Sequence, residues 1–305
     1  QPSKRLAVFK NVIVYRIGPG WSAQVAQMEA ALEPARFVAC GASQEQSAGW
    51  VEPRGEAHGP LVEAVGGQLL LKFMTEAKVL PGSVVNRKAQ EQVAHIEATT
   101  GRKPGKKETR EIKEDVRQAL LPMAFTKQSR INVWIDPVAS LLLVDAASQG
   151  KADEVVTALV KSLEGLSLTL LNTKTSPTAA MSGWLTSQEP PAGFSVDREC
   201  ELKAADESKS VVRYAHHALD IDEVREHIEA GKLPTKLALT WEGRVSLLLT
   251  ESLQIKKIAF LEGVFDGTSQ EKEDGFDADA AIATGELRKL MPDLLLALGG
   301  EVVPG

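Results

Sequence analysis

Ile131-Asn132-Val133-Trp134-Ile135-Asp136 and Leu141-Leu142-Leu143-Val144-Asp145 are two β-rich runs, separated by the turn residues Pro137-Val138-Ala139-Ser140. Runs of this composition on either side of a short turn predict a β-hairpin. A helix at about 152–163 and a strand at 166–171 are predicted to follow. The order strand, strand, helix, strand indicates an α+β fold, in which mixed or antiparallel sheets are covered by packed helices.

The residues before this hairpin predict a further α+β region. Hydrophobic spacing predicts a strand at 8–16, a helix at 24–32 and strands at 37–40, 49–51 and 68–74. Pro81-Gly82-Ser83 then begins a helical stretch at 84–99. A link at 101–105 that contains Gly and Pro connects it to a second helix, which ends at Leu121-Pro122. Two helices joined in this way predict a helical hairpin that projects from the sheet.

The residues after the hairpin predict a separate C-terminal region. Prolines and glycines are frequent at 172–193, so this stretch is predicted to be a turn-rich boundary. Beyond it the patterns predict strands near 194–203, 210–215, 234–241, 244–250 and 254–260, with helices at 220–230 and 277–298. The predicted regions are an N-terminal α+β region at 1–80, the hairpin at 81–122, a β-β-α-β region at 123–175 and a C-terminal α+β domain at 176–305.

Positive charge is concentrated in one short segment of this acidic chain. The 29 residues from Arg102 to Arg130 carry nine cations and four carboxylates, a balance of +5. Because the formal net charge of the whole chain is −6, the other 276 residues carry −11. Such segregation places like charges close together, where they repel one another. It is therefore typical of a face that meets a polyanion.

The spacing of these cations predicts a stripe on a helix. Lys103, Lys106, Arg110, Lys113 and Arg117 follow each other at intervals of 3, 4, 3 and 4 residues, and would form one line roughly 21 Å long if helical throughout. The same helix would carry its acidic and apolar side chains on two other sides, namely Glu108, Glu111 and Asp115 on one, and Ile112, Val116, Ala119 and Leu120 on the other. The alternative interpretation is a solvated face stabilised by pairs such as Lys107 with Glu111.

Composition bounds the class of protein. A chain of 305 residues with 43% apolar and 25% charged residues can bury a sizeable core. No apolar run approaches the ~20 residues that span a bilayer, and residues 1–10 lack a signal pattern, so we expect a cytoplasmic protein without membrane contact. Cys40 and Cys200 have no partner spacing and are expected to be small buried hydrophobic residues rather than disulfide or zinc ligands.

No motif for catalysis, metal binding or a cofactor is predicted. Histidines and carboxylates gather only at His216, His217, Asp220, Asp222 and His227, where a solvated turn is the favoured interpretation. Asp136 and Asp145 could serve metal-dependent phosphodiester cleavage, but each ends a strand of one hairpin, where aspartate is common. We therefore expect a binding protein rather than an enzyme.

Several short motifs, in order, resemble one family. They are Phe9-Lys10-Asn11-Val12-Ile13-Val14-Tyr15-Arg16, Phe37-Val38-Ala39-Cys40-Gly41, Gly49-Trp50-Val51-Glu52-Pro53, Lys78-Val79-Leu80-Pro81, Leu120-Leu121-Pro122-Met123-Ala124-Phe125, Trp134-Ile135-Asp136, His227-Ile228-Glu229-Ala230-Gly231-Lys232, Thr235-Lys236-Leu237-Ala238-Leu239 and Phe276-Asp277-Ala278-Asp279. Together they resemble the recombination-associated RdgC family over about residues 6–301.

The resemblance implies a cytoplasmic, nucleoid-associated bacterial protein that is not an enzyme. Members of this family bind double-stranded DNA without sequence preference and restrain RecA-driven strand exchange. The resemblance also implies a ring-shaped homodimer whose positively lined hole encircles DNA, with subunit contacts at two places. Phe125 matches a residue at such a contact, and burial in the core is the alternative for this side chain.

The resemblance and the charge pattern together assign the DNA contacts. The residues expected to contact DNA are Arg102, Lys103, Lys106, Lys107, Arg110, Lys113, Arg117, Lys127, Arg130, Arg213 and His216. His216-His217 stands where a family member can carry a lysine-rich pair, so a contact there would weaken once the histidines lose their protons. Met123 likewise stands where a basic residue can occur.

The sequence leaves two other functions open. A metal-dependent nuclease would use Asp136, Asp145 or the His216 group. A protein-interaction scaffold with no direct role on DNA would dock a basic partner on the acidic segment 262–279 and leave the lysine stripe solvated.

Overall fold

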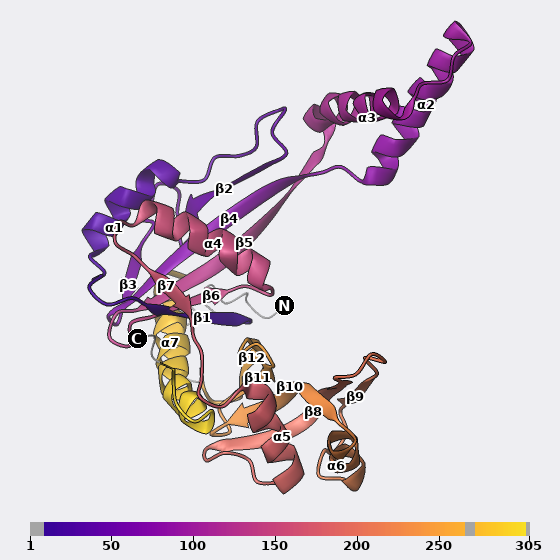
Figure 1. Cartoon of the computed structure of the whole chain (residues 1–305). Helices are drawn as coiled ribbons and strands as arrows, with labels where there is room; N and C mark the ends of the chain where they lie inside the picture. Colours follow the sequence, from indigo (N-terminus) through magenta and orange to yellow (C-terminus); the bar gives the residue numbers. More distant parts are fainter. Residues whose placement is uncertain (1–8, 266–271, 303–305) are drawn as a thin grey trace. The chain divides into compact units, whose positions relative to one another are not determined.

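The computed structural model describes residues 9–265 and 272–302, which contain seven α-helices and twelve strands (Figure 1). Every pair of neighbouring strands for which a register is defined runs antiparallel. The predicted α+β class is therefore confirmed, with an antiparallel sheet. The chain forms two compact units, of which unit 1 comprises residues up to 31, 52–71 and 132 onward, and unit 2 comprises 32–51 and 72–131.

Unit 1 contains most of the strands. They are β1 (Val12–Ile17), β3 (Glu63–Val65), β6 (Leu141–Asp145), β7 (Leu168–Leu170), β8 (Phe194–Ala204), β9 (Val211–Ala215), β10 (Lys232–Trp241), β11 (Val245–Thr250) and β12 (Ile255–Phe260), with parts of β4 (Gln68–Val79) and β5 (Phe125–Asp136). Along the main path of the sheet their hydrogen-bonded order is β4-β5-β6-β1-β12-β11-β10-β8-β9, while β3 pairs with β4 and β7 pairs with β1. The hairpin predicted at 131–145 is confirmed, since Val133 pairs with Val144 and Asp136 with Leu141.

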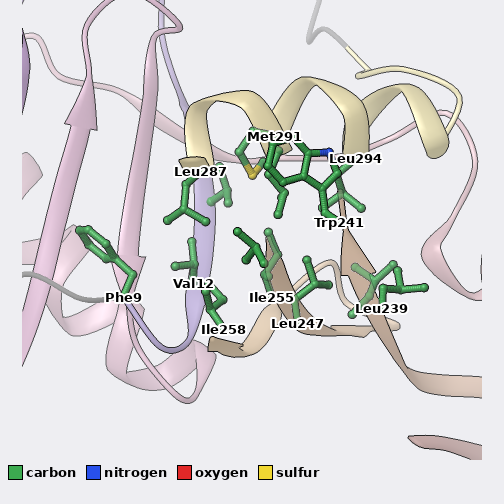
Figure 2. Close-up of a cluster of buried hydrophobic side chains, with 14 of the residues drawn as sticks. Phe9, Val12, Leu239, Trp241, Leu247, Ile255, Ile258, Leu287, Met291 and Leu294 are labelled. Atoms are coloured by element: carbon green, nitrogen blue, oxygen red, sulfur yellow. The ribbon is translucent and has the colours of Figure 1, made fainter. Parts of the chain in front are cut away.

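A large part of the core of unit 1 lies between this sheet and α7 (Lys272–Ala297). Figure 2 shows Leu287, Met291 and Leu294 of α7 pointing toward Leu247 of β11 and Ile255 of β12. All five side chains are at most 4% exposed, and burying a side chain of this size contributes about 1.5–3 kcal/mol. Burial of such side chains on both elements explains why α7 stays attached to the sheet.

Unit 1 also contains α4 (Gln149–Ser162), α5 (Pro177–Ser187) and α6 (Asp222–Glu229), and α1 spans Val25–Leu32. Helix α5 lies inside 172–193, so the prediction of a turn-rich stretch there was wrong. The Ser176 side chain accepts a hydrogen bond from the Ala179 backbone N–H, and Pro177 occupies the first turn. Proline favours a helix at that position because the missing N–H would have had no partner within the helix.

Unit 2 is built on β2 (Gln46–Val51) and the remaining parts of β4 and β5, in the order β2-β4-β5. The predicted helical hairpin is present as α2 (Gly82–Thr100) and α3 (Lys106–Leu120). Its inner faces meet at the buried residues Ala89, Ile112 and Val116. Gly101 ends α2 in the left-handed conformation, with φ of 69°, which glycine adopts without steric cost.

The strand predicted at 37–40 is absent, so this prediction was wrong. Arg36, just before this segment, makes an isolated bridge with Trp50, and the Phe37 N–H donates to the Trp50 carbonyl. It approaches β2 at Gly49, where a Cβ atom would lie 2.5 Å from Phe37 Cα and 2.8 Å from the Ala35 carbonyl oxygen. Gly49 thus allows a close backbone approach in place of a regular strand pair.

Gly49→Ala should destabilise the protein by about 2–3 kcal/mol, because the added methyl group meets backbone atoms that cannot rotate away. Denaturant titration of the full chain measures the change. Gly82→Ala is the matched control, since nothing lies within 4 Å of its Cβ position in the first turn of α2. Equal midpoints for the two variants would contradict the close approach at Gly49.

Candidate nucleic-acid interface

The predicted stripe lies on α3, although it is shorter than the sequence suggested. Helix α3 begins at Lys106, so Arg102 and Lys103 belong to the link before it. Within α3, Lys106, Arg110, Lys113 and Arg117 follow one another at helical spacing, and all four are exposed. One face of α3 therefore carries cations over its whole length.

The apolar side of α3 packs against α2 as predicted, with one exception. Ile112 and Val116 are buried, and Leu120 packs against them together with Val85, Val93 and Ile96 of α2. Ala119 is exposed, so the prediction that it packs was wrong. It lies in the last turn of α3.

Two arginines of the basic segment are already paired with carboxylates. Arg102 donates to both oxygens of Glu108, at 2.9 and 3.0 Å, and Arg117 donates to both oxygens of Glu45, at 2.6 and 3.0 Å. The hydrogen bond from Arg102 lowers the pKa of Glu108. Bidentate pairs of this kind hold the guanidinium in a fixed orientation.

The remaining predicted DNA contacts of unit 2 differ from these two arginines. Along the described part of unit 2, seven of the predicted DNA contacts are exposed and make no ion pair. These are Lys103, Lys106, Lys107, Arg110 and Lys113 on the hairpin, and Lys127 and Arg130 on β5. Burial, followed by the positive charge of Arg130, lowers the pKa of Lys72 on β4.

Arg213 and His216 belong to unit 1. Arg213 on β9 donates from Nε to Glu201 at 2.6 Å, and the exposed His216 follows the same strand. The hydrogen bond from Arg213, joined by those from Thr235 and Lys236, lowers the pKa of Glu201 to about 2. Arg213 is therefore held by a carboxylate, whereas His216 has no such partner among the residues described.

Phe125 is 87% exposed at the start of β5, and Met123 two residues earlier is 72% exposed. Burial of Phe125 in the core, the alternative left open by the sequence, is therefore wrong. Large apolar side chains exposed close together are characteristic of interaction surfaces.

The two aspartates considered for catalysis lie far apart on their hairpin. Asp136 pairs across the sheet with Leu141, and Asp145 lies four residues further along β6, which places their backbones about 13 Å apart. Two metal ions that share a phosphodiester are about 4 Å apart, so these two carboxylates do not form such a site together.

Each of these aspartates has partners within the protein. Asp136 accepts from the Val138 and Ala139 backbone N–H groups and from Arg288. Asp145 accepts from two backbone N–H groups, while burial raises its pKa. In the ranges that the structure describes, no group of three His, Cys, Asp or Glu side chains could hold a metal ion.

The structure also describes both cysteines and part of the acidic segment. Cys200 is buried as expected, and burial raises its pKa to about 12, so the thiol stays protonated. Cys40 is only half-buried, with its Sγ 3.5 Å from the Ser47 hydroxyl. Of the acidic segment 262–279, residues 266–271 lie outside the described residues.

Comparison with known proteins decides the family. A family model with the description "Putative exonuclease, RdgC" matches residues 8–301. The recombination-associated protein RdgC of Janthinobacterium sp. (strain Marseille) is 45% identical over 297 residues, which cover 96% of this chain and 98% of that protein. The chain belongs to the RdgC family. The recombination-associated protein RdgC of Dechloromonas aromatica (strain RCB) is 42% identical over 301 residues, which cover 97% of this chain and 98% of that protein.

Membership in the RdgC family confirms the resemblance drawn from the motifs. The relatives are named for recombination, whereas the family description names an exonuclease. No helix in the described ranges is long and apolar enough to cross a membrane. The sequence did not reveal Glu45 as the partner of Arg117, because the two residues are 72 positions apart.

Proposed function

We propose that this RdgC-family protein binds double-stranded DNA through its phosphates, without sequence preference. The observation that carries the proposal is the set of seven exposed, unpaired cations of unit 2 described above. Five of the seven are lysines, whose flexible ammonium groups act as point charges. Phosphate contacts of this kind position a protein on a duplex but carry no sequence information.

The biological role we propose is negative modulation of RecA-dependent recombination and of replication-fork repair, in the cytoplasm at the nucleoid. The names of the relatives support a role in recombination. A protein that occupies duplex DNA limits access to it, and this is compatible with such modulation.

The assembly we propose is a homodimeric ring that encircles DNA. The exposed pair Met123 and Phe125 supports a subunit contact next to the hairpin. A ring whose lining is positive and whose outside is acidic also reconciles DNA binding with the net charge of −6.

A salt titration of duplex binding tests the proposal. If five phosphates are neutralised per subunit, log affinity should fall against log salt with a slope of about −4.5, or ~500-fold between 50 and 200 mM salt. Two duplexes of unrelated sequence should give the same curve. A slope near zero, or a strong preference for one duplex, would refute phosphate-based binding.

An exonuclease is the second candidate, because the family description names that activity. Linear duplex DNA incubated with the full chain and Mg²⁺ or Mn²⁺ should keep its length if the protein only binds. Progressive shortening from the ends would establish the exonuclease instead. A closed plasmid in the same reaction separates exonuclease from endonuclease activity.

A further inference from the structure

The helical hairpin of unit 2 packs around an apolar core of its own. The residues of this core all belong to α2 and α3, namely Val85, Ala89, Val93, Ile96, Ile112, Val116 and Leu120. Their packing holds the two helices together, but the core includes no residue of β2, β4 or β5. The orientation of the hairpin on these strands therefore depends on other contacts.

Two short chain connections and one pair of charged side chains join the hairpin to the strands. Residues 80–81 connect β4 to α2, and residues 121–124 connect α3 to β5. Arg117 adds two hydrogen bonds to Glu45, at 2.6 and 3.0 Å. Among the described residues, no other side-chain hydrogen bond or ion pair joins the hairpin to the strands. The Arg117–Glu45 pair is thus placed to fix how the hairpin is oriented.

Glu45 is itself fixed to the strands by its backbone. It directly precedes β2, and its carbonyl accepts a hydrogen bond from the Lys78 N–H at 2.8 Å, next to the pair Gln46 with Ala77. Glu45 therefore continues the pairing of β2 with β4 by one residue. Its side chain reaches Arg117 in the last turn of α3, so the pair ties the end of this helix to the strands.

Arg117 is the last cation of the stripe on α3, and a phosphate could reach it. Lys106, Arg110 and Lys113 make no ion pair in the described structure, so Arg117 alone among the four is paired. The side chains of Arg117 and Glu45 are 48% and 47% exposed, and a pair exposed to this extent contributes little to stability. Arginine binds phosphate through two parallel hydrogen bonds, as it binds Glu45 here. Replacement of Glu45 by a phosphate therefore costs little.

We propose that the Arg117–Glu45 pair is an autoinhibitory contact of the DNA-binding face. Without DNA, Glu45 occupies Arg117 and ties the end of α3 to the strands. When duplex binds, a phosphate takes the place of Glu45 at Arg117, and the hairpin is free to change its orientation about residues 80–81 and 121–124. The inference rests on the proposed function and adds its regulation, because it makes Glu45 a residue that limits affinity.

Two substitutions of opposite expected effect test the contact in the full chain. Glu45→Gln should tighten binding of a mixed-sequence duplex by ~3-fold at 150 mM salt with an unchanged salt slope, because the complex keeps the same phosphate contacts. Arg117→Gln should make the slope shallower by about 0.9, the value of one phosphate contact. Glu114→Gln is the charge-matched control for Glu45→Gln, since Glu114 lies on α3 near Arg117 and accepts a hydrogen bond from Gln118 instead.

The orientation of the hairpin provides a second arm that does not depend on DNA. Spin labels on Glu97→Cys of α2 and Ser129→Cys of β5, both exposed, report the distance between hairpin and strands by double electron–electron resonance. Cys40→Ser removes the half-buried thiol, and the buried Cys200 stays unlabelled. The distance distribution should be narrow in the protein with Glu45 and broad in Glu45→Gln, and added duplex should broaden the former.

The two arms separate failure of the contact from failure of the proposed function. A broad distribution for Glu45→Gln in a protein that fails to bind duplex would support the tie to the strands and refute the function. If duplex binds, but Glu45→Gln equals Glu114→Gln in affinity and in distance distribution, the autoinhibitory contact is wrong while the function stands. An unchanged salt slope for Arg117→Gln would likewise overturn the exchange of Glu45 for a phosphate.

Discussion

Arg110→Glu combined with Lys113→Glu is expected to weaken duplex binding by at least ~30-fold at 150 mM salt. The two residues lie on the exposed face of α3 and have no ion-pair partner in the described structure, so they are available to phosphates. Loss of two phosphate contacts should reduce the salt slope by about 1.8, and the new carboxylates add repulsion. Fluorescence anisotropy of a labelled duplex over a range of salt concentrations measures both quantities.

The control for this variant carries the same change of charge elsewhere. Lys161→Glu with Lys174→Glu also lowers the net charge by four, at exposed positions of unit 1. It should bind duplex with nearly the wild-type slope, because it removes no proposed contact. Equal binding by the two double variants would favour the interaction scaffold, in which the lysine stripe is only solvated.

Phe125→Asp is expected to weaken the association of two subunits by at least ~30-fold. An aromatic residue at the centre of an interface typically contributes 2 kcal/mol or more, about 1.4 kcal/mol being tenfold in affinity. Because Phe125 is 87% exposed within the chain, the substitution should leave folding intact. Sedimentation equilibrium over a range of protein concentrations measures the dissociation constant.

Val138→Asp is the matched control for Phe125→Asp. Val138 is 79% exposed in the turn between β5 and β6, and no contact role is proposed for it. Its variant should associate like the wild type. If Phe125→Asp also associates like the wild type, the subunit contact lies elsewhere on the chain.

Much of the fold was predictable because its signals are local. The hairpin at 131–145 has β-rich runs on both sides of a turn, and the 3,4 spacing of α3 separates its apolar side from its charged side. Segment 37–40 also has strand composition, but its place against Gly49 is a tertiary contact that composition does not specify.

The site was predictable only in part, because some of its features depend on tertiary contacts rather than on local signals. A charge run identifies a basic face, because charge segregation is a property of the sequence. The charge run does not identify which cations already pair with a carboxylate, since Glu45, the partner of Arg117, lies in a distant segment of the sequence.

Retention on closed-circular duplex compared with linear duplex of the same sequence tests encirclement most directly. The protein, with its mass determined in parallel, is loaded at low salt and then challenged with high salt that removes phosphate contacts. We predict a dimer that stays on closed circles and is lost from linear DNA, because a ring can slide off free ends. A monomer, or equal loss from both DNA forms, would contradict the ring.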